Sequence, residues 1–325
     1  MKKLFITSTS SSAGKTTVGL SIALNLAGTI GYFKPFTLNN DHLLFEKIAK
    51  IPQTHTESSE RADSPENPPS ITDQYTRVAR GKDLMIIESG PNLSYGAYRN
   101  LSSVDIARAL DVEPIIIVQG STEVIVDKLS MAQSCFSAIK GVIINKISSA
   151  DAHETKTVTI PLIEDIDIPV IGSVPSYKPL RMITAHDIVT HLNAHVVNEE
   201  GMEKGIDTML VGAMSFDAAL TYFRRYTDKV VVTGGDRAEI MLAAMETSTS
   251  CIMATGGVRP SPPVIKKAVE LNIPILLVKG DTYSAAKAIQ NIKSQIHPED
   301  REKITIIKKH IAAHIHVDTL LTDIL

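Results

Sequence analysis

The sequence predicts an α/β fold: a P-loop domain with a mostly parallel, doubly wound sheet, followed by a second, smaller α/β domain. Three observations predict this. Short β-branched runs alternate with amphipathic stretches along the chain, a Gly-Lys-Thr loop follows the first run, and a polar stretch near residue 200 precedes a second αβ series. The chain of 325 residues is also long for a single core, which favours two domains.

The composition is that of a globular protein, with 43% hydrophobic and 21% charged residues. A formal net charge of −3 argues against nucleic acid and anionic membrane surfaces as partners. Cys135 and Cys251 lie far apart, which suits a reducing compartment and argues against a disulfide framework. No apolar run approaches the length that spans a bilayer, so we expect a cytoplasmic protein.

The first domain is predicted to contain six strands that are mostly apolar on both faces, as central parallel strands covered by helices are. They are Leu4–Thr7, Ile30–Lys34, Leu84–Glu88, Pro114–Val118, Gly141–Asn145 and Val170–Gly172. Between the second and third strands lies His55–Ser70, rich in Ser, Glu and Pro. We expect an exposed loop there, either a lid or a poorly ordered insertion.

The second domain is predicted to be a compact α/β unit with its own core. Its expected strands are Thr208–Val211, Val230–Thr233, Cys251–Ala254 and Ile273–Val278, and its expected helices are Phe216–Arg225, Arg237–Glu246, Pro263–Leu271 and Ser284–Ile292. We place the domains at residues 1–197 and 198–325. Met182–Val197 either closes the first domain or opens the second.

A phosphate-binding loop joins the first strand to an apolar helix. The expected nucleotide contacts are Thr9, Ser10, Ser11, Ser12, Ala13, Gly14, Lys15, Thr16 and Thr17. Such a loop directs backbone N–H groups at anionic oxygens where a helix begins. Lys15 would reach the β- and γ-phosphates, and the Thr16 hydroxyl would ligate magnesium. Thr9 replaces the first glycine of the usual pattern, but the order of strand, loop and helix is intact.

Charged and amide residues at neighbouring strand ends complete the predicted site. Glu88 directly follows an apolar run and is a candidate magnesium ligand; the alternative is a solvated strand end. Asp41 is a second candidate ligand, or a helix N-cap. Lys34 ends its strand at the same edge of the sheet as the phosphate loop, where α/β sheets bind ligands, so we predict Lys15 and Lys34 as catalytic residues. The alternative is that Lys34 only reaches solvent. Asn145 would contact the base or terminate its strand as a turn residue.

Two Thr-Gly-Gly-x-Arg turns repeat in the second domain. The predicted ligand contacts are Gly234, Gly235, Asp236, Arg237, Thr255, Gly256 and Gly257. Glycine pairs leave backbone N–H groups unshielded, which suits close contact with phosphate, so we expect an adenine nucleotide there. The alternative is that both pairs serve tight turns and subunit packing.

The segment Ile6-Thr7-Ser8-Thr9-Ser10-Ser11-Ser12-Ala13-Gly14-Lys15-Thr16 resembles the phosphate loop of dethiobiotin synthetase, with Ser8 and Ser10 replacing a glycine and an aspartate. Gly31-Tyr32-Phe33-Lys34-Pro35 is similar to that family's Tyr-Lys-Pro segment, whose lysine lies in the substrate site. Ile87-Glu88-Ser89-Gly90 resembles a segment whose glutamate helps to hold magnesium, although Ser89 and Pro91 interrupt its glycine run. Asp41 is the nearest match to a further metal-binding aspartate.

The second half resembles the DRTGG domain at Thr233-Gly234-Gly235-Asp236-Arg237, Glu246-Thr247-Ser248-Thr249, Thr255-Gly256-Gly257 and Asp281-Thr282-Tyr283. This order of domains resembles the amino-terminal region of long phosphotransacetylases. In that family an acetyl-transferring domain follows, and this sequence ends at Leu325, so we expect no acetyl transfer by the chain itself.

Three hypotheses follow, all with ATP and Mg²⁺ as cofactors. The first is a regulatory protein that senses adenine nucleotides and acts on a partner enzyme. The second is an ATP-dependent ligase of the dethiobiotin synthetase type, acting on a small carboxylate or carbamate. The third is an ATPase switch whose output is dimerisation. We also expect a homodimer.

Overall fold

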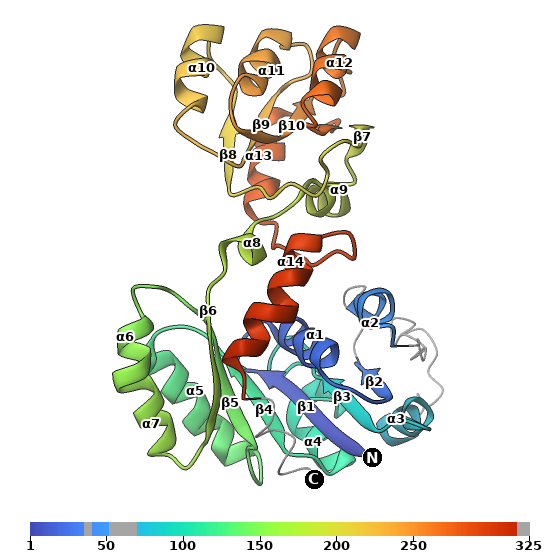
Figure 1. Cartoon of the computed structure of the whole chain (residues 1–325), viewed down its shortest axis with the longest axis vertical. Helices are drawn as coiled ribbons and strands as arrows, with labels where there is room; N and C mark the ends of the chain where they lie inside the picture. Colours follow the sequence, from blue (N-terminus) through green and yellow to red (C-terminus); the bar gives the residue numbers. More distant parts are fainter. Residues whose placement is uncertain (36–40, 52–69, 317–325) are drawn as a thin grey trace. The chain divides into compact units, whose positions relative to one another are not determined.

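The computed structural model describes residues 1–35, 41–51 and 70–316, without the side chains of Asp41 and His42. The chain divides into two compact units (Figure 1). Unit 1 consists of Met1–Tyr177 together with Arg301–Leu325, and unit 2 is Lys178–Asp300. Except for Ser70, the segment predicted as an exposed loop lies outside the described residues.

Unit 1 is built on a six-stranded sheet in the order β2-β3-β1-β4-β5-β6. All of its neighbouring strands pair in parallel. The strands are β1 (Lys2–Ser8), β2 (Ile30–Phe33), β3 (Leu84–Glu88), β4 (Pro114–Val118), β5 (Gly141–Ile147) and β6 (Val170–Pro175). Each overlaps a predicted strand, so the six predicted strands are confirmed.

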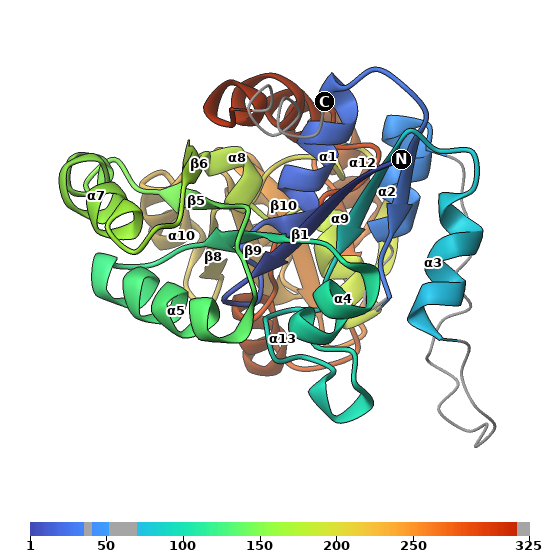
Figure 2. The ribbon, with the colours of Figure 1, turned by 90° about the horizontal axis from the view of Figure 1, so that it is seen from below.

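Helices cover both faces of this sheet (Figure 2). Phe5 and Ile87 pack in one apolar cluster with α3 (Ile71–Ala79) and α4 (Ser103–Leu110). In a second cluster, β4 and β5 pack against α5 (Thr122–Cys135) and α7 (Ile160–Glu164). On the other face, Gly19 of α1 (Lys15–Asn25) approaches Ile6 and Ile86. The sheet is therefore doubly wound, as predicted.

The remaining helices of unit 1 are short. They are α2 (Asp41–Ala49), η1 (Ala97–Arg99), α6 (Ala152–Glu154), η2 (Thr155–Thr159), α14 (Arg301–Ile306), η3 (Ile307–Ile311) and η4 (Ala312–His314). The last three form one helical segment that packs on α1, where the Ser21 hydroxyl donates to the Ile307 carbonyl at 2.8 Å. The segment 301–316 therefore belongs to unit 1, although the sequence assigned it to the second domain.

Unit 2 contains a five-stranded sheet in the order β7-β11-β10-β9-β8. Its strands are β7 (His195–Asn198), β8 (Thr208–Val211), β9 (Lys229–Gly234), β10 (Thr249–Thr255) and β11 (Ile275–Leu277). Four of them are parallel, and β7 joins β11 antiparallel. β7 was not predicted, because it is short, its first residue is exposed and its next two are only partly buried.

Two apolar clusters cover the two faces of this sheet. One contains α10 (Phe216–Phe223), α11 (Ala238–Met245) and α12 (Pro262–Glu270). The other contains α9 (Ala185–Leu192) and α13 (Thr282–Gln290). The short helix α8 (Lys178–Arg181) begins the unit. Because α9 and β7 belong to unit 2, the division falls at residues 177 and 178 and differs from the expected boundary at 197 and 198.

Within the described residues, no helix combines the length and apolarity needed to cross a bilayer.

Candidate functional site

The phosphate loop connects the end of β1 to the start of α1, as the sequence predicts. Ser12 and Gly14 have left-handed backbones, with φ of 58° and 101°. Left-handed residues in a short loop turn successive N–H groups toward one side, which forms a concave anion-binding surface. A Cβ on Gly14 would lie 2.2 Å from Nδ2 of Asn145, so this position admits only glycine without displacing Asn145.

Lys15 is 7% exposed and lies across the loop at the amino end of α1. Its Nζ donates to Oγ of Ser8 at 2.8 Å and to the carbonyl of Pro91 at 3.1 Å. Both acceptors are neutral, whereas phosphate oxygens would give shorter and stronger charge-assisted bonds. The ammonium is thus held beside the loop in a position that favours an anion.

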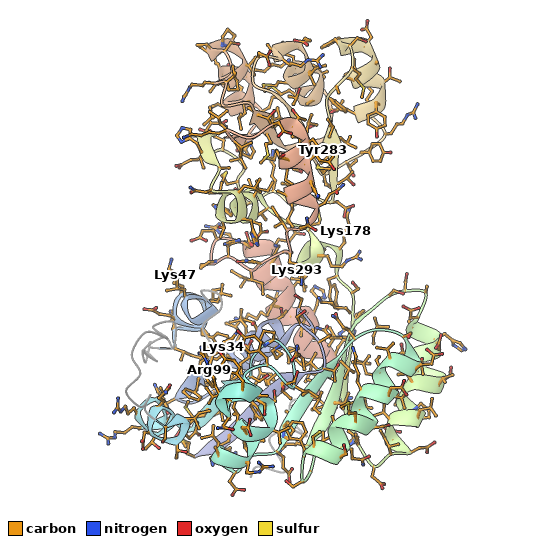
Figure 3. All side chains as sticks on the ribbon, turned by 180° about the vertical axis from the view of Figure 1, so that it is seen from behind. Lys34, Lys47, Arg99, Lys178, Tyr283 and Lys293 are labelled. Atoms are coloured by element: carbon orange, nitrogen blue, oxygen red, sulfur yellow. The ribbon has the colours of Figure 1, made fainter. Side chains whose placement is uncertain are left out.

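Glu88 joins three polar side chains at the carboxyl end of β3. Its Oε1 accepts from the hydroxyl of Thr16 at 2.9 Å and from Nζ of Lys34 at 2.8 Å. Its Oε2 accepts from the hydroxyl of Tyr32 at 2.8 Å. Lys34 follows β2 (Figure 3), and the pairing of Phe33 with Ile87 makes the next residues, Lys34 and Glu88, neighbours.

The charge of Glu88 is stabilised despite burial. Only 2% of Glu88 is exposed, and burial alone would raise the pKa of its carboxyl. The positive charges of Lys34 and Lys15 and hydrogen bonds from Lys34 and Tyr32 outweigh that effect and hold the pKa below its ordinary value. Glu88 is therefore a buried, ionised carboxylate whose charge is offset by two lysines and whose oxygens accept from Lys34 and from the hydroxyls of Thr16 and Tyr32.

Asn145 and Lys146 hold the loop from β5. Nδ2 of Asn145 donates to the Ala13 carbonyl at 2.7 Å, and Nζ of Lys146 donates to the Ser12 carbonyl at 2.5 Å. These two bonds give Asn145 a loop-supporting role that the sequence did not predict. Its predicted contact with a nucleotide base stays a prediction.

The other predicted loop contacts vary in exposure. The N–H of Thr9 donates to the Ile117 carbonyl at 3.3 Å, and its buried Oγ1 has no hydrogen-bond partner in the described part of the chain. The hydroxyl of Ser10 accepts from Nε2 of Gln119 at 3.4 Å. Ser11 is exposed and Thr17 half-buried. Asp41 begins α2, but its side chain lies outside the described part of the structure.

The donors present suit magnesium bound together with phosphate. Among the described residues there is no cluster of three His, Cys, Asp or Glu side chains that would hold a metal alone. Magnesium commonly keeps waters and binds through few protein groups plus substrate phosphates. The hydroxyl of Thr16 and the carboxylate of Glu88 form such a small set, beside the loop that would hold the phosphates.

The paired-glycine turns of unit 2 contact each other. A Cβ on Gly235 would lie 1.8 Å from the Val258 carbonyl oxygen, so this glycine permits a close backbone approach. The N–H groups of Gly256 and Gly257 donate to the carbonyls of Gly280 and Val278, both at 2.9 Å. These two N–H groups are therefore already engaged, which corrects the expectation that they are directed at a ligand.

The charged residues of the same turns are also engaged locally. The N–H of Gly235 donates to the Thr255 carbonyl at 3.1 Å. Nη2 of Arg237 donates to the Met214 carbonyl at 2.9 Å, and its Nε pairs with Glu239 at 3.2 Å. Glu239 thus offsets part of the positive charge of Arg237, which the sequence analysis listed as a ligand contact. The Asp236 carboxylate lies against the backbone of Gly234, because a Cβ there would be 2.5 Å from its Oδ1.

Sequence reasoning missed Tyr32 and Ser8 as contacts of Glu88 and Lys15. A signal existed for Tyr32, because it is a hydroxyl-bearing residue two positions before Lys34 in an otherwise apolar strand. For Ser8 the signal was its place at the end of β1, directly before the loop. The contact of Lys15 with the Pro91 carbonyl depends on the path of the backbone after β3, which no residue pattern announces.

Comparison with known proteins agrees with this architecture. Residues 2–184 match the AAA domain family, and residues 187–292 match the DRTGG domain. The chain is 24% identical to a phosphate acetyltransferase of Haemophilus influenzae over 76% of its length, and 25% identical to one of Pseudomonas aeruginosa over 98%. It spans 40% and 52% of the length of these two relatives.

Solved structures with similar folds cover parts of the chain. A MinC:MinD cell division protein complex from Aquifex aeolicus is 15% identical, with a TM-score of 0.39, over 55% of this chain and 84% of that one. The CBS and DRTGG domains of a Clostridium perfringens pyrophosphatase, complexed with diadenosine tetraphosphate, are 18% identical, with a TM-score of 0.30, over 53% of this chain and 87% of that one.

Proposed function

The chain belongs to the AAA domain family through residues 2–184 and carries a DRTGG domain over residues 187–292, and we propose on this basis that unit 1 binds ATP with magnesium and hydrolyses it slowly. We infer that the output is regulatory: adenine-nucleotide binding is sensed and acts on a partner enzyme. The contact between the Thr16 hydroxyl and the Glu88 carboxylate, beside the buried Lys15, carries this proposal.

Different residues of unit 1 are proposed to contact the phosphates and the magnesium of Mg-ATP. In the proposed complex, Lys15 and the backbone from Ser10 to Gly14 contact the phosphates, because the loop leads into the amino end of α1 and Nζ of Lys15 lies beside it, bonded to Ser8. Thr16 and Glu88 hold magnesium or its waters, with Asp41 as a further candidate. When bound, magnesium neutralises phosphate charge. Lys34 lies close enough to Glu88 to place a second positive charge beside the transferable phosphoryl group.

A ligase of the dethiobiotin synthetase type is a second candidate function. The observation that favours it is the group Lys34, Tyr32 and Glu88 beside the loop, which offers a cation and a hydroxyl to an acidic acceptor. ATP turnover measured alone and with a panel of small carboxylic acids separates the two functions. Basal turnover that no acid stimulates supports the regulatory function, and stimulation by an acid supports the ligase.

Unit 2 is proposed to bind an adenine nucleotide as the second sensing site, and the whole protein is proposed to act as a homodimer. The structure of unit 2 supports a nucleotide site in two ways. Unit 2 has its own sheet and apolar clusters, and Gly234, Thr255 and the residues that follow them lie at the carboxyl ends of β9 and β10, where parallel α/β sheets bind ligands.

The magnesium dependence of ATP binding tests the proposal for unit 1. ATP affinity of the full chain is measured by calorimetry with magnesium and with excess chelator. The wild type is expected to lose about tenfold or more of its affinity on chelation, since phosphate charge loses a counterion. Thr16→Val and Glu88→Gln are expected to shrink that difference, while Thr157→Val, at an exposed threonine of η2, keeps it. An ATP affinity that ignores chelation in the wild type would overturn the proposed magnesium site.

A further inference from the structure

Unit 2 contains a cavity of about 610 Å³ at the carboxyl end of β11. This volume falls within the range of small-molecule sites. The cavity lies beside the paired-glycine turns but extends away from them, toward β7 and α13. Its lining residues are Leu192, Asn193, His195, Gly257, Leu277, Val278, Lys279, Gly280, Ser284 and Ala285.

The topology of the sheet explains why a crevice forms there. The chain leaves β10 for α12, which packs with α11 on one face, and it leaves the adjacent β11 for α13, which packs with α9 on the other (Figure 1). Adjacent parallel strands whose connections leave to opposite faces open a crevice outside their carboxyl ends, and α/β sheets bind ligands at such points. The cavity occupies this switch point in unit 2.

The ionisable side chains that line the cavity favour an anion. Lys279 and His195 are its only ionisable lining residues, and no carboxylate is among the ten residues. In the described part of the chain, neither side chain makes a hydrogen bond or ion pair. The nearby Asp281 is directed to the start of α13, where it accepts from the N–H of Ser284 at 2.9 Å. Its other carboxylate oxygen accepts from the hydroxyl of Ser284 at 2.7 Å, and these bonds hold the pKa of Asp281 below its ordinary value, so Asp281 is an ionised neighbour of the cavity that the helix start holds in place.

The remaining lining residues suit a ligand with an apolar or planar body. Leu192, Leu277, Val278 and Ala285 provide apolar surface, and Asn193 and Ser284 provide hydrogen-bonding groups at the same cavity. A few polar groups on a mostly apolar wall are typical of sites for small organic ligands. The occupant should therefore combine an anionic group with a planar ring system.

Two glycines keep the cavity open. A Cβ on Gly280 would meet no other residue within 4 Å, and one on Gly257 would meet only Cα of Lys279, at 3.8 Å. Gly257 has a φ of +67°, which favours glycine independently, whereas Gly280 has no left-handed backbone. A larger side chain at Gly280 would thus enter open space at the cavity without straining the backbone.

We infer that this cavity, and not the amides of the paired-glycine turns, is the nucleotide site of unit 2. Lys279 and His195 contact the phosphate of a mononucleotide-sized ester, and the apolar wall contacts its base. This inference rests on the proposed function, in which unit 2 binds an adenine nucleotide. The cavity is preferred to the turn amides as the binding site because the N–H groups of Gly256 and Gly257 already donate to carbonyls.

Calorimetric titration of AMP into the full chain tests the inference, in a Lys15→Ala background that weakens binding at the phosphate loop. Lys279→Ala is expected to weaken AMP binding about tenfold, as loss of one charge-assisted hydrogen bond does. Gly280→Phe is expected to abolish binding by filling the cavity. Lys287→Ala, at an exposed lysine of α13 outside the cavity, is the matched control and is expected to bind normally. Thermal unfolding of each variant verifies its fold.

The outcomes separate the inference from the function on which it rests. If no AMP binds in the Lys15→Ala background, the proposed nucleotide site of unit 2 is wrong, and the cavity assignment with it. If AMP binds but Lys279→Ala and Gly280→Phe leave the affinity unchanged while Arg237→Ala lowers it, the function stands and the cavity assignment is overturned. Inorganic phosphate that binds as tightly as AMP would overturn the assignment of the apolar wall to the base.

Discussion

At the scale of single residues, the site depends on the side chains that donate hydrogen bonds to the buried carboxylate of Glu88. A buried carboxylate is unfavourable unless paired, and here Lys34, Thr16 and Tyr32 donate to it. The sequence placed Lys34 and Glu88 in one crevice because both follow buried strands. It did not predict their direct ion pair, because that contact depends on the strand register that pairs Phe33 with Ile87.

Lys34→Ala is predicted to lower ATP turnover more than ATP binding. The lysine places positive charge where a transferring phosphoryl group would develop charge, so its loss should reduce kcat about a hundredfold while changing ATP affinity much less. Single-turnover kinetics and calorimetry on the same samples measure the two effects. Lys47→Ala, at an exposed lysine of α2 (Figure 3), is the control. Turnover that is normal in Lys34→Ala would leave this lysine as a structural partner of Glu88.

At the scale of elements, the strands of both sheets were predictable because they are short, β-branched and bounded by turn residues. The edge strand β7 was not, since His195–Asn198 is only partly buried and pairs antiparallel with β11. Four residues whose burial runs from exposed at His195 to buried at Asn198, without alternation, give too little pattern to predict a strand. The packing of η3 on α1 was also missed, because it depends on a contact between residues almost 300 positions apart.

Lys229, in β9, makes the stability of unit 2 depend on pH. It is fully buried, its Nζ donates to the carbonyls of Tyr226 and Ser248, and burial lowers its pKa from 10.5 to about 8. Between these two values the unfolded chain binds more protons than the folded one, so the free energy of unfolding should rise with pH.

Lys229→Met is therefore predicted to remove a stability gain on the order of 2 kcal/mol between about pH 8 and pH 10.5. The difference in unfolding free energy between wild type and variant is measured across this window, which cancels the titration of shared groups. Lys287→Met, at an exposed lysine of α13, is expected to track the wild type. A difference between wild type and Lys229→Met that is independent of pH would contradict the assignment.

At the scale of the whole molecule, the order of a P-loop unit and a DRTGG unit was predictable from local motifs, but the division between them was not. Motifs locate the centres of domains, whereas the limits depend on which core receives a helix. Ala185 and Ile188 of α9 pack with Cys251 and Met253 in unit 2, and 301–316 returns to unit 1. Neither assignment is visible in local composition.

Two fragments of unit 2, one that begins at residue 178 and one that begins at residue 198, are predicted to differ in stability. Residues 178–300 should fold alone, because they contain both apolar clusters of the sheet. Residues 198–300 lack α9 and most of β7, which exposes one face and one edge of the sheet, and should aggregate or unfold. Circular dichroism and thermal unfolding compare the two fragments. Equal stability would show that α9 and β7 contribute little to the unit.

The central claim is that the phosphate loop of unit 1 binds Mg-ATP through Lys15, and calorimetry of the full chain tests it most directly. Lys15→Ala is predicted to weaken ATP binding by about 2 to 4 kcal/mol, because phosphate oxygens lose a buried charged partner. Lys156→Ala, at an exposed lysine of η2 in the same unit, is predicted to bind as the wild type does. A folded Lys15→Ala protein with unchanged ATP affinity would contradict the account.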